Sequence, residues 1–181
     1  GYRVYLIKND IMHIKEMIYL NREAQLGLWE YIYAHDSMID EVHGNNYYSE
    51  PIAFELEDSD IKETIRPYAM GRIIDIEQFF GHYSCCTHKP AVCFEIVVTD
   101  ELLPWNNGSF RVMFENGKCS ITDEVPQYSM KMTIGTLTTM LMGYKTAEKL
   151  YGMNRISSAP EAVKRLDDTL LHSMPYISDY I

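Results

Sequence analysis

The chain has 181 residues, of which 46% are hydrophobic and 23% charged, and its formal net charge is −10 at pH 7. This composition is ordinary for a globular protein and excludes a chain that is disordered throughout. The negative charge argues against a nucleic-acid partner, because phosphate backbones are bound by clustered lysine and arginine. No apolar run is long enough to span a bilayer, so we expect no membrane partner either.

The cysteines indicate the cellular compartment of the protein, and the first residues indicate whether further sequence precedes the chain. Cys85 and Cys86 are adjacent, and Cys93 and Cys119 lie in strand-like runs, which is not the pattern of a disulfide framework. We therefore expect a reducing, cytoplasmic environment. The start, GYRVYLIKND, is typical of a strand interior and not of a signal peptide, so we expect Gly1 to follow upstream sequence in a longer protein.

A hairpin is predicted at the start of the chain. Apolar and polar side chains alternate over residues 2–8 and again over residues 11–20, with the period of a strand. Asn9 and Asp10 between them tolerate positive φ and suit a two-residue turn.

The residues after this hairpin predict a helix and two further strands. Asn21 is placed to cap a helix that runs to about Asp36. A strand is predicted in EPIAFELED, residues 50–58, and another in AMGRIID, residues 69–75. The polar stretch between them, residues 58–68, predicts a loop and marks our candidate domain boundary.

The second half gives clearer signals. A short helix is predicted over residues 76–83 and a strand over residues 91–100. Residues 108–123 give the best hairpin signal in the chain, because Asn116 and Gly117 supply a type I′ turn between two alternating runs.

Further helices are expected towards the end. A strand over residues 128–134 precedes helices predicted over residues 137–143 and 146–151. Ser158 starts an S-x-x-E capping box, which predicts a last helix to about Leu171. Mostly antiparallel strands followed by helices give an α+β fold class.

One short stretch carries possible metal ligands. His82, Cys85, Cys86 and His88 lie within seven residues, and thiolates and imidazoles are zinc ligands. Zinc sites usually separate paired ligands by two to four residues, whereas these cysteines are adjacent, so a loop without metal is favoured. The methionines of residues 130–153 are able to line a ligand cavity, but an ordinary core is the favoured interpretation.

The stretch LLPWNNGSF is the most distinctive in the chain. Pro104, Asn106, Asn107 and Gly108 are turn residues, whereas Trp105 is a large aromatic where turns are usually polar. We expect Trp105 to be buried beneath its loop.

Four stretches together carry a family resemblance. They are EPIAFELEDSDIKETIRPYAMGRIIDIEQFF, VTDELLPWNNGSF, LTTMLMGYKTAEKLY and the ending PYISDYI, and they extend over essentially the whole chain in order. They resemble the enhanced intracellular survival (Eis) family of acetyltransferases, whose members end in PYFSDYF.

The resemblance implies a particular domain organisation. Residues 1–70 would be the C-terminal half of a second, GNAT-like acetyltransferase domain, and residues 71–181 a sterol-carrier-protein-like α+β domain with a mainly antiparallel sheet. An N-terminal GNAT domain of the same chain would lie upstream and bind acetyl-CoA. The family assembles as hexamers, so a homo-oligomer is expected for the full-length protein.

The GNAT-like half is expected to bind no cofactor of its own. GNAT enzymes hold the cofactor pyrophosphate on a [QR]-x-x-G-x-[GA] loop at a helix N-terminus. Here the corresponding stretch is YLNREAQLGLWEYI, in which Arg22 is present but Gln25 replaces the first glycine. Acetyl-CoA is therefore expected only in the full-length protein.

The resemblance also assigns a role to the end of the chain. The C-terminal carboxylate, here on Ile181, would be the general base that accepts a proton from an amine substrate. Tyr176, Asp179 and Tyr180 would anchor the tail or bind substrate. Ile181 replaces the family's usual Phe, so the carboxylate is retained without the ring.

Two other functions remain open. The sterol-carrier-like fold is compatible with a carrier of an apolar ligand, although fold alone does not give function. A purely structural, oligomerising domain is the third interpretation.

Overall fold

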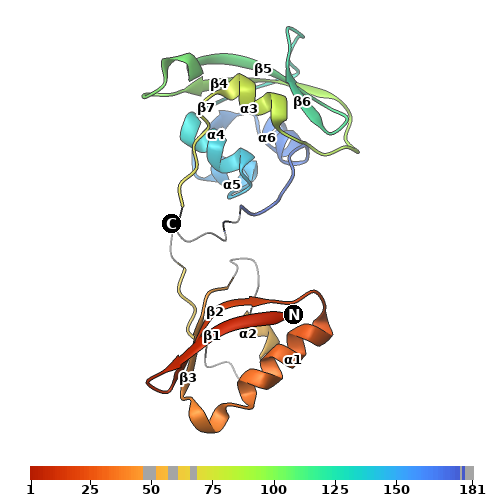
Figure 1. Ribbon diagram of the computed structural model, residues 1–181. Coiled ribbons are helices and arrows are strands. Elements are labelled where there is room, and N and C mark those ends of the chain that lie inside the picture. The colour runs from red at the N-terminus through yellow and green to blue at the C-terminus, as the bar shows by residue number, and fades with distance from the viewer. Residues whose placement is uncertain (47–51, 57–60, 66–68, 176, 178–181) are drawn as a thin grey trace. The chain divides into compact units, whose positions relative to one another are not determined.

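The computed structural model describes residues 1–46, 52–56, 61–65, 69–175 and 177. The chain divides into two compact units, Gly1–Arg66 and Pro67–Ile181 (Figure 1). Each unit has its own sheet, and the two are described separately.

The first unit is built on a three-stranded sheet in the order β1-β2-β3. Strands β1 (Tyr2–Lys8) and β2 (Ile11–Ile18) form an antiparallel hairpin, and β3 (Glu41–Gly44) pairs parallel to β2. Asn9 and Asp10 have φ of 53° and 59°, which confirms the predicted turn. The short, exposed β3 was not predicted.

One long helix packs on this sheet. Helix α1 (Arg22–Tyr33) begins as predicted, because the Asn21 side chain accepts a hydrogen bond from the Ala24 amide at 2.8 Å. The Arg3 guanidinium of β1 lies 3.5 Å from the centre of the Tyr31 ring, so the contact between strand and helix is partly a cation–π interaction.

Two predicted strands do not form in the described residues. Of residues 50–58 the structure describes 52–56, in which α2 (Ile52–Glu55) is a one-turn helix whose Glu55 is bonded to Arg22 and Gln25 of α1. Residues 69–75 form no strand either. The Ile73 amide instead donates to the Thr138 hydroxyl at 3.2 Å, so this backbone bonds to a helix side chain rather than to a neighbouring strand.

The second unit has a five-stranded, mainly antiparallel sheet in the order β6-β5-β4-β7-β8, in which only β4 and β7 pair in parallel. The Asn116-Gly117 turn joins β5 to β6 with φ of 50° and 82°, as predicted. The strands are β4 (Val92–Thr99), β5 (Gly108–Glu115), β6 (Lys118–Ile121), β7 (Tyr128–Thr133) and β8 (Ile156–Ser158).

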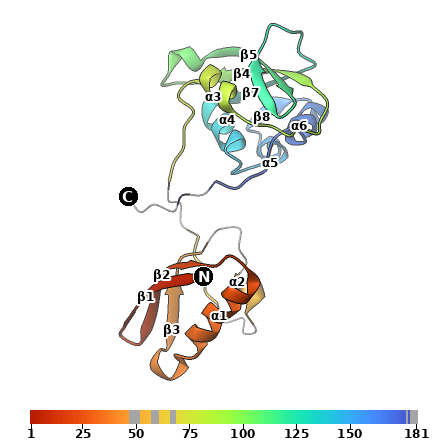
Figure 2. The ribbon, with the colours of Figure 1, turned by 45° about the vertical axis from the view of Figure 1, so that its right-hand side comes forward.

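Four α-helices complete the described part of this unit, and Figures 1 and 2 show α4, α5 and α6 together on one face of the sheet. They pack against apolar side chains that alternate along β4, β5 and β7 and form one continuous core. Phe114 lies at its centre, edge-on to Phe80 and Phe94. The helices are α3 (Ile76–His82), α4 (Ile134–Leu141), α5 (Ala147–Gly152) and α6 (Pro160–Asp167).

The predicted capping box at α6 is wrong. Ser158 ends β8 and its hydroxyl donates to the Ser129 carbonyl at 2.7 Å, so it is a strand contact. Ala159 is the N-cap, without a side-chain bond, and Pro160 takes the first helical position, where its missing N–H costs nothing. The helix ends at Asp167, before the predicted Leu171.

Candidate functional site

The four predicted tail residues, Tyr176, Asp179, Tyr180 and Ile181, lie outside the described residues. Their roles therefore stay predictions. The structure does describe residues 169–175, which join α6 to those positions and which we call the tail root.

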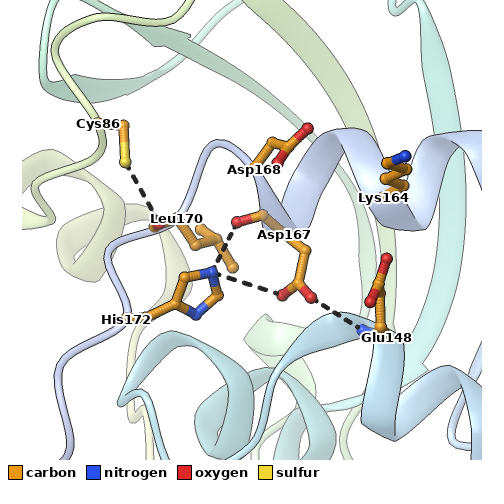
Figure 3. A pocket seen from close by; sticks show the side chains of 7 residues that line it. All are labelled: Cys86, Glu148, Lys164, Asp167, Asp168, Leu170 and His172. Atoms are coloured by element: carbon orange, nitrogen blue, oxygen red, sulfur yellow. Dashed lines mark hydrogen bonds and ion pairs between the residues drawn. The ribbon is translucent and has the colours of Figure 1, made fainter.

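Hydrogen bonds to the loop at Cys86 and to the end of α6 hold the tail root. The Cys86 amide donates to the Thr169 carbonyl at 3.0 Å, and its thiol donates to the Leu170 carbonyl at 3.4 Å. Further along, His172 Nε2 donates to the Asp167 carbonyl at 2.9 Å (Figure 3). This bond requires the proton on Nε2, because a carbonyl oxygen can only accept.

A cavity of about 240 Å³ lies beside the tail root (Figure 3). The Asp167 carboxylate within it accepts from the amides of Ala147 and Glu148 at 2.8 and 3.3 Å, and so caps α5. Charged side chains dominate the lining, which does not suit an apolar ligand. The lining residues are Cys86, Glu148, Lys164, Asp167, Asp168, Leu170 and His172.

The residues weighed as zinc ligands do not converge. The Cys85 thiol is buried and donates to the Lys118 carbonyl, whereas Cys86 faces the tail root. His82 Nδ1 lies 2.9 Å from the Gln78 carbonyl of its own helix. In the described part of the chain, no three His, Cys, Asp or Glu side chains are placed to hold a metal ion.

The W-N-N-G turn forms a buried polar cluster that joins its loop to the start of α3. Asn106, which is 1% exposed, donates to the Ile74 carbonyl and the Asp100 carboxylate, and accepts from the Ile76 amide. Trp105 is 61% exposed, so its predicted burial is wrong. Its indole N–H donates to the Ile74 carbonyl at 2.9 Å, and the small amide of Asn106 fills the interior position.

At the N-terminus of α1, two side chains of the helix bind the carboxylate of Glu55. Glu55 of α2 accepts from Arg22 Nη1 and from Gln25 Nε2, each at 2.7 Å. Arg22 Nη1 also donates to Gln25 Oε1 at 2.8 Å. Sequence analysis missed Glu55, because it placed this residue on a strand.

This end of α1 is where the family resemblance would place a cofactor pyrophosphate. The two side chains that face the position, Arg22 and Gln25, are both engaged with Glu55. A second anion there would meet the Glu55 carboxylate, so the arrangement disfavours phosphate binding.

None of the helices in the described residues is long and apolar enough to cross a bilayer.

Several solved structures share this architecture. A conserved protein of unknown function from Enterococcus faecalis V583, titled a probable N-acyltransferase, is 26% identical with a TM-score of 0.92, and the match covers 100% of this chain and 46% of that one. A GCN5-related N-acetyltransferase from Anabaena variabilis is 20% identical with a TM-score of 0.77, over 99% and 46% of the two chains. Eis1 from Mycobacterium abscessus is 19% identical with a TM-score of 0.74, over 94% and 43%. The chain thus spans less than half the length of these structures.

No curated protein matches the sequence. Two family models match it, one after the other. The acetyltransferase (GNAT) domain model matches residues 1–73, and the sterol carrier protein domain model matches residues 76–178, which is more than half of the chain. The chain therefore belongs to the sterol carrier protein domain family and carries an acetyltransferase (GNAT) domain segment before that domain.

Proposed function

We propose that this chain is the C-terminal portion of an Eis-like N-acetyltransferase, which transfers an acetyl group from acetyl-CoA to an amine. The observation that carries the proposal is the match over 100% of the chain, at a TM-score of 0.92, to a probable N-acyltransferase of which it covers 46%. The GNAT segment would span residues 1–70 and the sterol-carrier-like domain residues 71–181.

Acetyl-CoA would be bound by an upstream GNAT domain and not by residues 1–70. Support comes from the start of α1, where Glu55 already occupies the side chains of Arg22 and Gln25. In this proposal residues 1–70 serve to position the other domains.

The tail would contribute the general base. The amine nitrogen attacks the acetyl carbonyl, a C–N bond forms, and the thioester C–S bond breaks with CoA as the leaving thiolate. The amine must lose a proton in this step, and the main-chain carboxylate of Ile181 would accept it. Tyr176 and Tyr180 would anchor the approach, and Asp179 would orient the tail or face solvent.

The working protein would be a cytoplasmic homo-oligomer, a hexamer by resemblance. The apolar-carrier alternative has less support, because the space between sheet and helices is filled by buried side chains. Those of β7 and α4 are typical: Met130, Met132, Leu137 and Met140 are 0–3% exposed.

The test compares two proteins: the full reading frame that contains this chain, and residues 1–181 alone. With acetyl-CoA and a panel of amines, the full protein should release CoA thiol, which a thiol reagent measures, and should yield acetylated amine by mass spectrometry. Calorimetry should detect acetyl-CoA binding to the full protein only. Tight, stoichiometric binding by residues 1–181 alone, or no amine-dependent turnover by the full protein, would overturn the proposal.

A further inference from the structure

Gly143 ends helix α4 with a backbone that favours glycine. Its φ is +75°, in the left-handed region. The Gly143 amide donates to the Met140 carbonyl at 2.9 Å, and the Tyr144 amide donates to the Thr139 carbonyl at 3.1 Å. These two bonds are a Schellman motif, whose residue after the cap is usually glycine and sometimes asparagine.

The tail root passes directly over this glycine. A Cβ at Gly143 would lie 2.0 Å from the carbonyl oxygen of Ser173, and 3.0 and 3.4 Å from its carbonyl carbon and its nitrogen. All three are backbone atoms, so no side-chain rotation relieves the contact. The Schellman motif alone would admit asparagine, whereas the contact with Ser173 admits only glycine.

Gly143 therefore acts together with the two bonds described above. Cys86 holds the backbone at Leu170, and His172 is tied to the last turn of α6 (Figure 3). With Gly143 beneath Ser173, three separate parts of the unit contact residues 170, 172 and 173. We call Gly143, Cys86 and His172 the tail clamp.

We propose that the tail clamp is a positioning device for the C-terminal carboxylate. Ser173 precedes Ile181 by eight residues, and eight extended residues reach at most about 26–29 Å. The clamp thus sets the point from which the general base reaches the substrate. If the clamp opened, the fixed point would move back along the chain and the carboxylate would sample a larger volume. The inference rests on the proposed function of the tail.

Two glycine variants separate the contact from backbone strain. Gly143→Asn keeps a residue that tolerates positive φ but adds the Cβ that meets Ser173, and Gly143→Ala adds both strain and contact. Asn154→Ala is the control, because Asn154 also has positive φ, 56°, so alanine there brings strain without that contact.

The first measurement is amide hydrogen exchange in the 181-residue chain, which requires no activity, at Cys86, whose amide donates to the Thr169 carbonyl, and at Leu170, whose amide donates to the Leu166 carbonyl. Exchange should be at least tenfold faster in both Gly143 variants and unchanged in Asn154→Ala. Unchanged exchange in Gly143→Asn would refute the clamp.

The second measurement is steady-state kinetics of the full-length protein. The Gly143 variants should lose about 10- to 100-fold in kcat with little change in KM for the amine, as expected when a catalytic group is misplaced. Added formate should partly restore kcat, because a free carboxylate replaces the misplaced base. Faster exchange with wild-type kcat would overturn the positioning role.

A third variant covers the case in which the glycine variants do not fold. His172→Gln keeps a donor near the Asp167 carbonyl and His172→Ala removes it, and this side chain is half exposed. Only the alanine variant should show faster exchange and lower kcat, and equal behaviour of the two would refute the clamp. If the wild-type enzyme transfers no acetyl group at all, the proposed function fails, while the exchange data still decide whether the clamp exists.

Discussion

Asp100 is a buried carboxylate with four hydrogen-bond donors around it, from Arg72, Asn106 and the backbone amides of Leu102 and Leu103. Burial by itself would raise its pKa, but these donors favour the charged form and hold the pKa of Asp100 well below its usual range. A carboxylate whose pKa is lower in the folded than in the unfolded state stabilises the fold above about pH 4. That stabilisation is lost as the pH falls from there.

We predict that Asp100→Asn lowers Tm at pH 7 by roughly 5–10 °C, because the charged partner of these donors is removed. The difference from wild type should shrink as the pH falls below about 4, because the Asp100 carboxyl takes up a proton in the unfolded wild-type protein while the folded protein still holds it charged. Thermal unfolding at several pH values measures both effects. Asp123→Asn, at an exposed position, is the control, and a Tm difference that is the same at every pH would contradict the argument.

We predict that replacing Asn106 by alanine destabilises the fold more than replacing the larger Trp105. Trp105→Ala removes one hydrogen bond from an exposed side chain and should cost about 1 kcal/mol. Asn106→Ala leaves the buried Ile76 amide without its hydrogen-bond acceptor and removes the two bonds that the Asn106 side chain donates. It should therefore lower the free energy of unfolding by about 2–4 kcal/mol. Urea unfolding of the 181-residue chain measures both, and a larger loss for Trp105→Ala would mean that the indole is buried after all.

The conformation of single residues could be predicted from the sequence where the residues themselves and their neighbours determine it. Asn9-Asp10 and Asn116-Gly117 turn the chain because of their own backbone preferences, and the structure confirms both. The exposure of Trp105 depends on what lies beneath its loop. Asn106 takes that place by bonding to residues about 30 positions earlier, which no local pattern reveals.

Among secondary-structure elements, strands β4, β5, β6 and β7 of the second sheet and helices α1, α3, α4 and α5 were predicted from sequence patterns. The elements that were predicted wrongly or missed are short or depend on contacts with distant parts of the chain. Strands β3 and β8 have four and three residues, too few to show alternation. The predicted strand at residues 50–58 has the alternation of a strand, but its described residues, 52–56, pair with no strand and include the helical turn α2.

The contact between α1 and α2 leads to a prediction at this scale. Glu55→Ala removes an ion pair with Arg22 whose two side chains are 55% and 35% exposed, so solvent screens much of its energy. An exposed pair is worth about 0.2–1 kcal/mol, so amide exchange in the first turn of α1 should rise about 1.5- to 5-fold. The increase should be smaller in 1 M salt.

Hydrogen exchange at low and high salt tests this. Glu30→Ala, on the exposed side of the same helix, is the matched control and should change exchange in the first turn very little. A salt-independent effect of Glu55→Ala would mean that packing of α2, rather than charge, holds the start of the helix.

For the whole molecule, the α+β class followed from the order of the elements, and the two family models match in the order that the resemblance implied. The candidate site was less accessible to sequence reasoning. The bond from the Cys86 thiol to the Leu170 carbonyl and the passage of Ser173 over Gly143 bring together segments that are far apart in the sequence, and neither leaves a pattern in it. Only the ending PYISDYI pointed to the tail, and it did so by resemblance.

The last prediction concerns the end of the chain in the full-length enzyme. Deleting Ile181 leaves a carboxylate on Tyr180, about 3.5 Å short, which exceeds hydrogen-bond reach. Adding a few residues after Ile181 replaces the carboxylate there by a neutral peptide. Both changes should lower kcat by about 10²–10⁴, the usual contribution of general-base catalysis, and leave Tm within a few degrees of wild type. Ile181→Phe keeps the carboxylate, restores the family's ring and should retain kcat. Steady-state kinetics, with intact mass spectrometry to verify each terminus, decides the matter: a verified extension that keeps wild-type kcat would show that the tail is only packed and that another group takes the proton.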